Sequence, residues 1–166
     1  MNPELLALHK RIKAELEDIE RSVISAQSAW EGARRFPDQQ DHFLNSLALN
    51  LHSFYNGLER IFEIIARRFD SSFPEGDRWH RDLLRQMAEE QTDARPAVLT
   101  GDSVKKLDEF LAFRHRVRNL YTFNPEPNRL NELLQRLPTA WERARTDIEG
   151  FLDLLDQAAG AEDEIR

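Results

Sequence analysis

Residues 5–30 read LLALHKRIKAELEDIERSVISAQSAW, and the spacing of their apolar side chains sets the fold class. These side chains recur at steps of three and four residues, the period of one face of an α-helix. The face consists of Leu5, Leu8, Ile12, Leu16, Ile19, Val23, Ala26 and Trp30. Because many of the intervening residues are charged, the pattern predicts a long amphipathic helix that ends before Pro37.

The same period recurs along the rest of the chain and predicts further helices. The second helix spans about residues 41–69, and a shorter third one spans about residues 77–90. The fourth begins at a cap, Asp102 or Ser103, and runs to about Tyr121. The last helix carries the apolar residues from Leu130 to Leu155. Residues 70–76 have the composition of a loop, and Pro138 predicts a kink or a restart in the last helix. We expect an all-α, antiparallel bundle of four long helices plus one short helix.

Length and composition narrow the class of protein. The chain of 166 residues suits one domain, expected over residues 1–159, with a frayed tail at 160–166. Without cysteine it cannot form disulfides, thiolate zinc sites or a cysteine nucleophile. Neither a membrane span nor a signal peptide is expected, since Glu4 and residues 9–11 interrupt the first apolar positions, so we expect a cytoplasmic protein. The net charge of −7 argues against a broad face for duplex nucleic acid.

The usual motifs for metals and cofactors are missing from the sequence. No two of the five histidines lie three or four residues apart, and no Glu-x-x-His pair occurs. A glycine-rich phosphate loop, an HExxH motif and a serine elbow are also absent. We therefore expect neither a metal nor a cofactor.

Residues 113–121, FRHRVRNLY, are the unusual segment. On a helical wheel, one polar strip beside the apolar face would hold Arg114, Tyr121, Arg118, His115 and Asn119. One interpretation is a solvated face whose cations favour the C-terminal end of the helix dipole. The other is a phosphate-handling site, because arginine grips phosphate and an imidazole moves a proton.

This segment resembles the signature of HEPN domains, specifically the HepT-like branch. That signature is an arginine, four to six residues, a histidine, one residue and a tyrosine; Arg114 and Tyr121 fit it, whereas Asn119 stands at the histidine position. Residues 51–62, 77–84 and 95–98 are also similar to this branch, and the resemblance extends from the first helix to about Ile148.

The resemblance implies a fold, an activity and partners. HepT-like proteins are helical homodimers that place two signature motifs around a shared cleft and cut RNA without a metal, as toxins. Their usual partner is a small MNT-type nucleotidyltransferase, an antitoxin that neutralises them and can transfer AMP to the motif tyrosine, here Tyr121.

In this reading each polar residue has an expected role. Arg114 and Arg118 bind the phosphate, His115 carries the proton in place of the missing histidine, and Asn119 holds the substrate or the ring. Tyr121 positions the phosphate and accepts AMP. Tyr55 and Glu59, four residues apart, are expected to support these residues without contacting the substrate. Glu59 either orients Arg114 or Arg118 or forms a plain surface ion pair.

A second hypothesis is a catalytically weak or inactive HEPN subunit that binds a nucleotidyltransferase through the same face. The acidic total charge and Asn119 favour this hypothesis, since an asparagine cannot shuttle a proton near neutral pH. A nucleic-acid binder without chemistry is disfavoured because few exposed aromatic residues accompany the arginines. We expect His52 and His80 to make local hydrogen bonds only.

Overall fold

The computed structural model describes residues 3–117 and 124–164, with side chains as far as residue 160. This part of the chain forms five α-helices: α1 (Pro3–Arg35), α2 (Gln40–Phe69), α3 (Trp79–Gln86), α4 (Gly101–Arg116) and α5 (Pro127–Glu164). A short 3-10 helix, η1 (Pro37–Gln39), joins α1 to α2. The described residues contain no strand, so the predicted all-α bundle of four long helices and a short one is confirmed.

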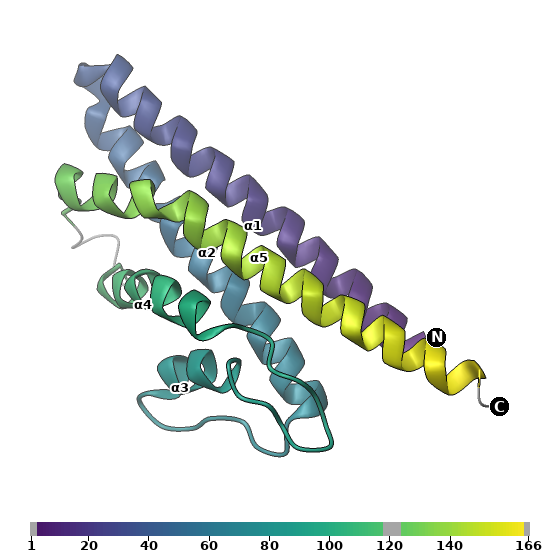
Figure 1. Ribbon diagram of the computed structural model, residues 1–166. Helices are drawn as coiled ribbons and strands as arrows, with labels where there is room; N and C mark the ends of the chain where they lie inside the picture. The colour runs from purple at the N-terminus through teal and green to yellow at the C-terminus, as the bar shows by residue number, and fades with distance from the viewer. Residues whose placement is uncertain (1–2, 118–123, 165–166) are drawn as a thin grey trace.

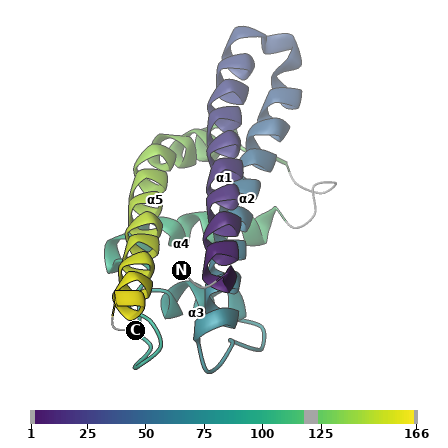
Figure 2. The ribbon, with the colours of Figure 1, turned by 90° about the vertical axis from the view of Figure 1, so that its right-hand side faces the viewer.

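The helices are arranged around α2. Figure 1 shows α1 and α2 as a long antiparallel hairpin, with α5 lying along it and α4 and α3 on the far side of α2. The start of α1 and the end of α5 lie close together, away from the closed end of the hairpin (Figures 1 and 2). Within residues 3–117 and 124–164, no helix combines the length and the apolar composition that crossing a membrane requires.

Aromatic side chains on α2 join it to α4 and α5. The Phe54 ring meets the Phe110 ring edge-on, with 5.1 Å between centroids, and the Trp141 ring at 6.2 Å. Phe54 and Phe110 are fully buried. Such edge-to-face pairs add to the burial of apolar area, so this contact fixes α4 against the middle of α2.

Two glycines allow α1 and α2 to approach closely. A Cβ atom at Gly57 would lie 2.5 Å from Cγ1 of Ile19, and a Cβ atom at Gly32 would lie 2.3 Å from the Phe43 ring. Neither separation is sterically possible without a shift of the neighbour. The close contact of the hairpin therefore depends on the absence of a side chain at these positions.

Helix α3 is shorter than the predicted segment 77–90, because the chain after Gln86 is held by long-range contacts. Arg95 is fully buried and forms a two-pronged ion pair with Asp70, with Nε–Oδ1 and Nη2–Oδ2 distances of 2.5 and 2.7 Å. It also donates to the backbone carbonyls of Gln86 and Glu89. These bonds occupy carbonyls near the end of α3 and close the segment back onto the end of α2.

The predicted cap of α4 at Asp102 or Ser103 is wrong, since the cap is Thr100. Its Oγ1 accepts from the Ser103 backbone N–H at 3.3 Å. Asp147 of α5 accepts from the Thr100 N–H at 2.8 Å and from the Ser103 hydroxyl at 2.6 Å. This carboxylate from a distant helix lies where the dipole of α4 favours negative charge, which explains the earlier start.

The other end of α4 also differs from the prediction. The helix ends at Arg116, because Val117 has φ −87° and ψ 6° and so leaves the α conformation. The helical wheel drawn from the sequence is therefore confirmed as far as Arg116, and its positions 118–121 lie outside the described residues.

Helix α5 contains Pro138 without a restart. Figure 2 shows the helix bent in its first, green part, as expected where a proline removes a backbone hydrogen bond. The helix continues to Glu164, and the domain limit at residue 159 stays a prediction.

Candidate functional site

Arg114, in the last turn of α4, is the centre of a polar cluster between α2, α3 and α4. Its Nε donates to Oδ1 of Asn56 at 2.6 Å, and its Nη2 lies 3.4 Å from Oε1 of Glu59. Both partners belong to α2, and 17% of the Arg114 side chain is exposed. The guanidinium is thus held by a carboxylate and an amide of α2, while part of the side chain reaches the surface.

Glu59 also binds His80, which α3 supplies. The His80 Nδ1 lies 2.7 Å from Oε2 of Glu59, and His80 Nε2 lies 3.5 Å from Nη1 of Arg114. Glu59 is 5% exposed and His80 7% exposed. Because an ionised carboxylate only accepts hydrogen bonds, His80 donates from Nδ1, and in the neutral ring Nε2 accepts from Arg114.

One face of α2 supplies the floor of the cluster. His52, Asn56 and Glu59 follow each other at spacings of four and three residues, which places them on the same side of the helix. Asn56 donates from Nδ2 to Nδ1 of His52 at 3.1 Å. Burial lowers the pKa of His52 and the charge of Arg114 lowers it further, against an opposing effect of Glu59. A neutral His52 is what this hydrogen bond requires.

Tyr55 lies beside these residues and is fully buried. Burial raises the pKa of its hydroxyl, and the charge of Glu59 raises it further. The hydroxyl therefore stays protonated at all ordinary pH values. It has no hydrogen-bond partner within residues 3–117 and 124–164.

His115 brings a second imidazole to the cluster from α4. Its ring centroid lies 5.5 Å from that of His80, with the two planes at 76°. The Trp79 ring lies on the His80 ring, with centroids 3.7 Å apart. His115 is exposed, whereas His80 is buried, so the outer imidazole is the one that solvent and ligands reach.

The cluster unites four of the seven residues that the sequence predicted. Arg114, His115, Tyr55 and Glu59 come together here, and Glu59 makes a buried ion pair instead of a plain surface pair. The other three predicted residues lie outside the described residues: Arg118, Asn119 and Tyr121.

Sequence reasoning missed three members of the cluster, one of which, His52, was expected to make local hydrogen bonds only. Asn56 was not expected in a site, and His80 was expected to make hydrogen bonds without a part in it. The spacing of His52, Asn56 and Glu59 was the available signal for Asn56. His80 could not be found in this way, since its contact with Glu59 joins residues 21 positions apart.

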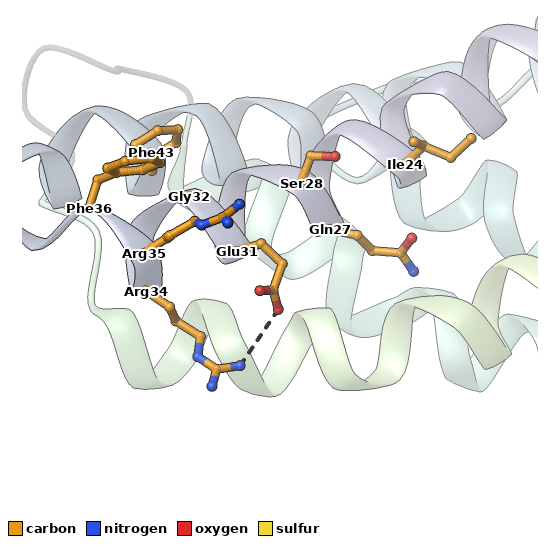
Figure 3. A pocket seen from close by; sticks show the side chains of 9 residues that line it. All are labelled: Ile24, Gln27, Ser28, Glu31, Gly32, Arg34, Arg35, Phe36 and Phe43. Atoms are coloured by element: carbon orange, nitrogen blue, oxygen red, sulfur yellow. Dashed lines mark ion pairs between the residues drawn. The ribbon is translucent and has the colours of Figure 1, made fainter.

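A separate groove lies at the closed end of the α1–α2 hairpin and shares no residue with this cluster. It has a volume of about 750 Å³ and is lined by nine residues, which belong to α1, to α2 and to the connection between them. Figure 3 shows the stacked rings of Phe36 and Phe43 on one side and the Glu31–Arg34 ion pair, 3.6 Å long, on the other.

A comparison with known families shows to which family the chain belongs. A family model described as "HepT-like protein" matches residues 46–155. The chain belongs to the HepT-like family. The match begins in α2 and ends in α5 and so includes every residue of the cluster in this HepT-like protein. No curated protein and no solved structure matches the chain.

The chemistry open to the cluster follows from its charges. The guanidinium of Arg114 is balanced by Glu59, and it has more N–H groups than these contacts use, so it can donate to an oxyanion such as phosphate. Two imidazoles lie close by, and the exposed one, His115, is placed for proton transfer. Among the described residues of this HepT-like chain, no group of three or more histidine, aspartate or glutamate side chains is placed to hold a metal.

Proposed function

We propose that this HepT-like chain is the toxin subunit of a toxin–antitoxin pair and that it cuts RNA in the cytoplasm without a metal. The observation that carries the proposal is the position of Arg114. Its guanidinium is fixed by Asn56 and by the buried Glu59, yet 17% of the side chain is exposed. A cation held in advance stabilises a phosphorane without reorganising during the reaction.

The reaction is a transesterification within the RNA. The 2′-oxygen attacks the adjacent phosphorus, the bond to the 5′-oxygen breaks, and a cyclic phosphate and a 5′-hydroxyl result. Arg114 and Arg118 stabilise the charge on the phosphorane, and His115 carries the proton from the 2′-oxygen toward the leaving 5′-oxygen. Asn119 and Tyr121 hold the substrate. The exposed position of His115 next to the Arg114 cluster supports its role.

The partners in this proposal are a second copy of the chain and an antitoxin. Two signature segments would face one cleft in a homodimer, so that arginines of both copies surround one phosphate. An MNT-type nucleotidyltransferase would neutralise the toxin by transferring AMP to Tyr121. Membership of the HepT-like family supports both partners.

One residue favours a second function. Asn119 stands where the family signature has a histidine, and general acid–base catalysis typically contributes ~10²–10⁴-fold. The alternative is a subunit that binds the nucleotidyltransferase through the same face and cuts RNA slowly or not at all.

Cleavage of a mixed-sequence RNA in EDTA by the purified protein separates the two functions. Arg114→Ala is expected to lower the rate by about 100-fold or more, the usual loss when one preorganised donor is removed. Arg116→Ala is the matched control, because Arg116 is an exposed arginine on the same turn of α4 and is expected to retain the rate.

Two results would contradict the enzyme proposal. Equal rates for both variants would show that a contaminant cuts the RNA. Absence of cleavage by the unaltered chain, with retained binding to a nucleotidyltransferase, would favour the interaction subunit.

A further inference from the structure

We propose that His80 is a positioning residue, which fixes the guanidinium of Arg114 for phosphate binding by way of Glu59. This inference rests on the proposed function for its consequence in RNA binding, although the contacts that carry it are independent of that function. His80 lies outside the signature segment and comes from α3, a helix of eight residues.

The first argument is the hydrogen bonding of Glu59. Its two oxygens have different partners: Oε2 accepts from Nδ1 of His80 at 2.7 Å, and Oε1 faces Nη2 of Arg114 at 3.4 Å. The Glu59 side chain is buried, and its shorter contact is the one with His80. The hydrogen bond from His80 therefore sets the plane of the carboxylate. Without His80 the carboxylate could rotate about its last bond and change the direction in which it holds Arg114.

The second argument is the orientation of the His80 ring itself. Since Nδ1 donates to Glu59, a neutral ring accepts at Nε2, and that atom faces Nη1 of Arg114 at 3.5 Å. Arg114 thus meets a partner at each of its three nitrogens: Asn56 at Nε, Glu59 at Nη2 and His80 at Nη1. The remaining N–H groups of the guanidinium are left to donate to a ligand.

The third argument concerns the role that His80 cannot take. Both of its ring nitrogens face protein groups, the Trp79 ring covers one side, and only 7% of the residue is exposed. A proton carrier must reach the substrate, which His115 on the surface does and His80 does not. His80 therefore acts through Arg114.

The test compares three replacements of His80 with a control. His80→Asn keeps an N–H donor near the place of Nδ1, whereas His80→Ala and His80→Gln do not donate to Glu59 from that place. His42→Ala is the control, because His42 is an exposed histidine of α2. Urea unfolding of each variant checks that it is folded, and the asparagine and glutamine variants fill much of the space of the ring.

Two readouts are made on each folded variant. The first is the rate at which the Nε–H of Arg114 exchanges with water, followed by NMR without any RNA. The second is the affinity for a 2′-O-methyl oligouridine, which carries phosphates but cannot be cut. We expect His80→Ala and His80→Gln to speed the exchange and to weaken RNA binding by about 10-fold, the size of one misplaced charged hydrogen bond. We expect His80→Asn and His42→Ala to stay near the unaltered protein.

The outcomes separate this proposal from the proposed function. Unchanged exchange in His80→Ala, or equal acceleration in His80→Asn and His80→Ala at equal stability, would overturn the positioning role. Accelerated exchange in His80→Ala and His80→Gln, with restoration in His80→Asn, supports it even when the unaltered protein does not bind the oligouridine. Failure of the unaltered protein to bind the oligouridine would count against the proposed RNA function and not against the positioning role of His80.

Discussion

At the scale of single residues, the cluster around Arg114 depends on one buried carboxylate. Glu59 neutralises Arg114 and accepts from His80, and almost none of it is exposed. Removing one member of a buried pair leaves the other without compensation, which is more costly than losing a pair at the surface.

Glu59→Gln is therefore expected to lower the free energy of unfolding by about 1–3 kcal/mol, measured by urea unfolding. Glu63→Gln is the matched control, one turn further along α2, where the side chain is 32% exposed and its carboxylate pairs with Arg67 at 3.7 Å. Its expected effect is below about 1 kcal/mol. Equal effects of the two substitutions would show that the Glu59 pairs contribute no more than a surface pair.

The buried hydroxyl of Tyr55 leads to the opposite expectation. It has no hydrogen-bond partner among the residues that the structure describes, and its burial without one is unfavourable. Tyr55→Phe is expected to leave the free energy of unfolding unchanged or to raise it by up to about 1 kcal/mol. A clear decrease in urea unfolding would reveal a partner for the hydroxyl.

His52 makes the stability depend on pH. Its folded-state pKa is lowered from 6.5 by burial and then by Arg114, so the unfolded chain binds the proton more readily. The free energy of unfolding therefore decreases as the pH falls below the pKa of His52 in the unfolded chain and approaches its pKa in the folded chain. We expect a smaller decrease in the free energy of unfolding between pH 7.5 and 5.5 for His52→Gln than for the unaltered chain. Identical pH dependence of the two proteins would exclude this role.

At the scale of elements, the sequence predicted what depends on neighbours along the chain. The apolar period placed α1 and α2 within a residue or two of their observed bounds. The start of α4 and the end of α3 were missed because Asp147 and Arg95 decide them, and both act from distant parts of the sequence. The same holds for the site: Glu59 was found from its spacing to Tyr55, whereas its bond to His80 exists only in the folded bundle.

The contact between α1 and α2 can be tested at a glycine. Gly57→Ala is expected to lower the free energy of unfolding by about 1–3 kcal/mol, because the new methyl group would collide with Ile19. Gly150→Ala in α5 is the control. Its Cβ would meet no atom within 4 Å, so the higher helix propensity of alanine should stabilise the protein by about 0.5–1 kcal/mol. Stabilisation by both substitutions would mean that the hairpin adapts without loss.

At the scale of the whole molecule, the proposed cleft needs two copies of the chain. One copy offers a partly exposed Arg114 and an exposed His115, and a two-fold axis would bring the same pair from the other copy to the opposite wall. Sedimentation at micromolar concentration is expected to give a dimer. A monomer under these conditions would remove the shared cleft, though not the cluster within each chain.

The Arg95–Asp70 pair has a consequence for the segment between its two members. It joins the residue after α2 to the residues before α4, and the loop 71–78 and α3 lie between them. The buried ion pair links the two ends of this segment, as a disulfide bond between the same positions would. A protease that cuts the exposed loop, for example near Gly76, should leave two fragments that remain associated, with His80 still seated against α2.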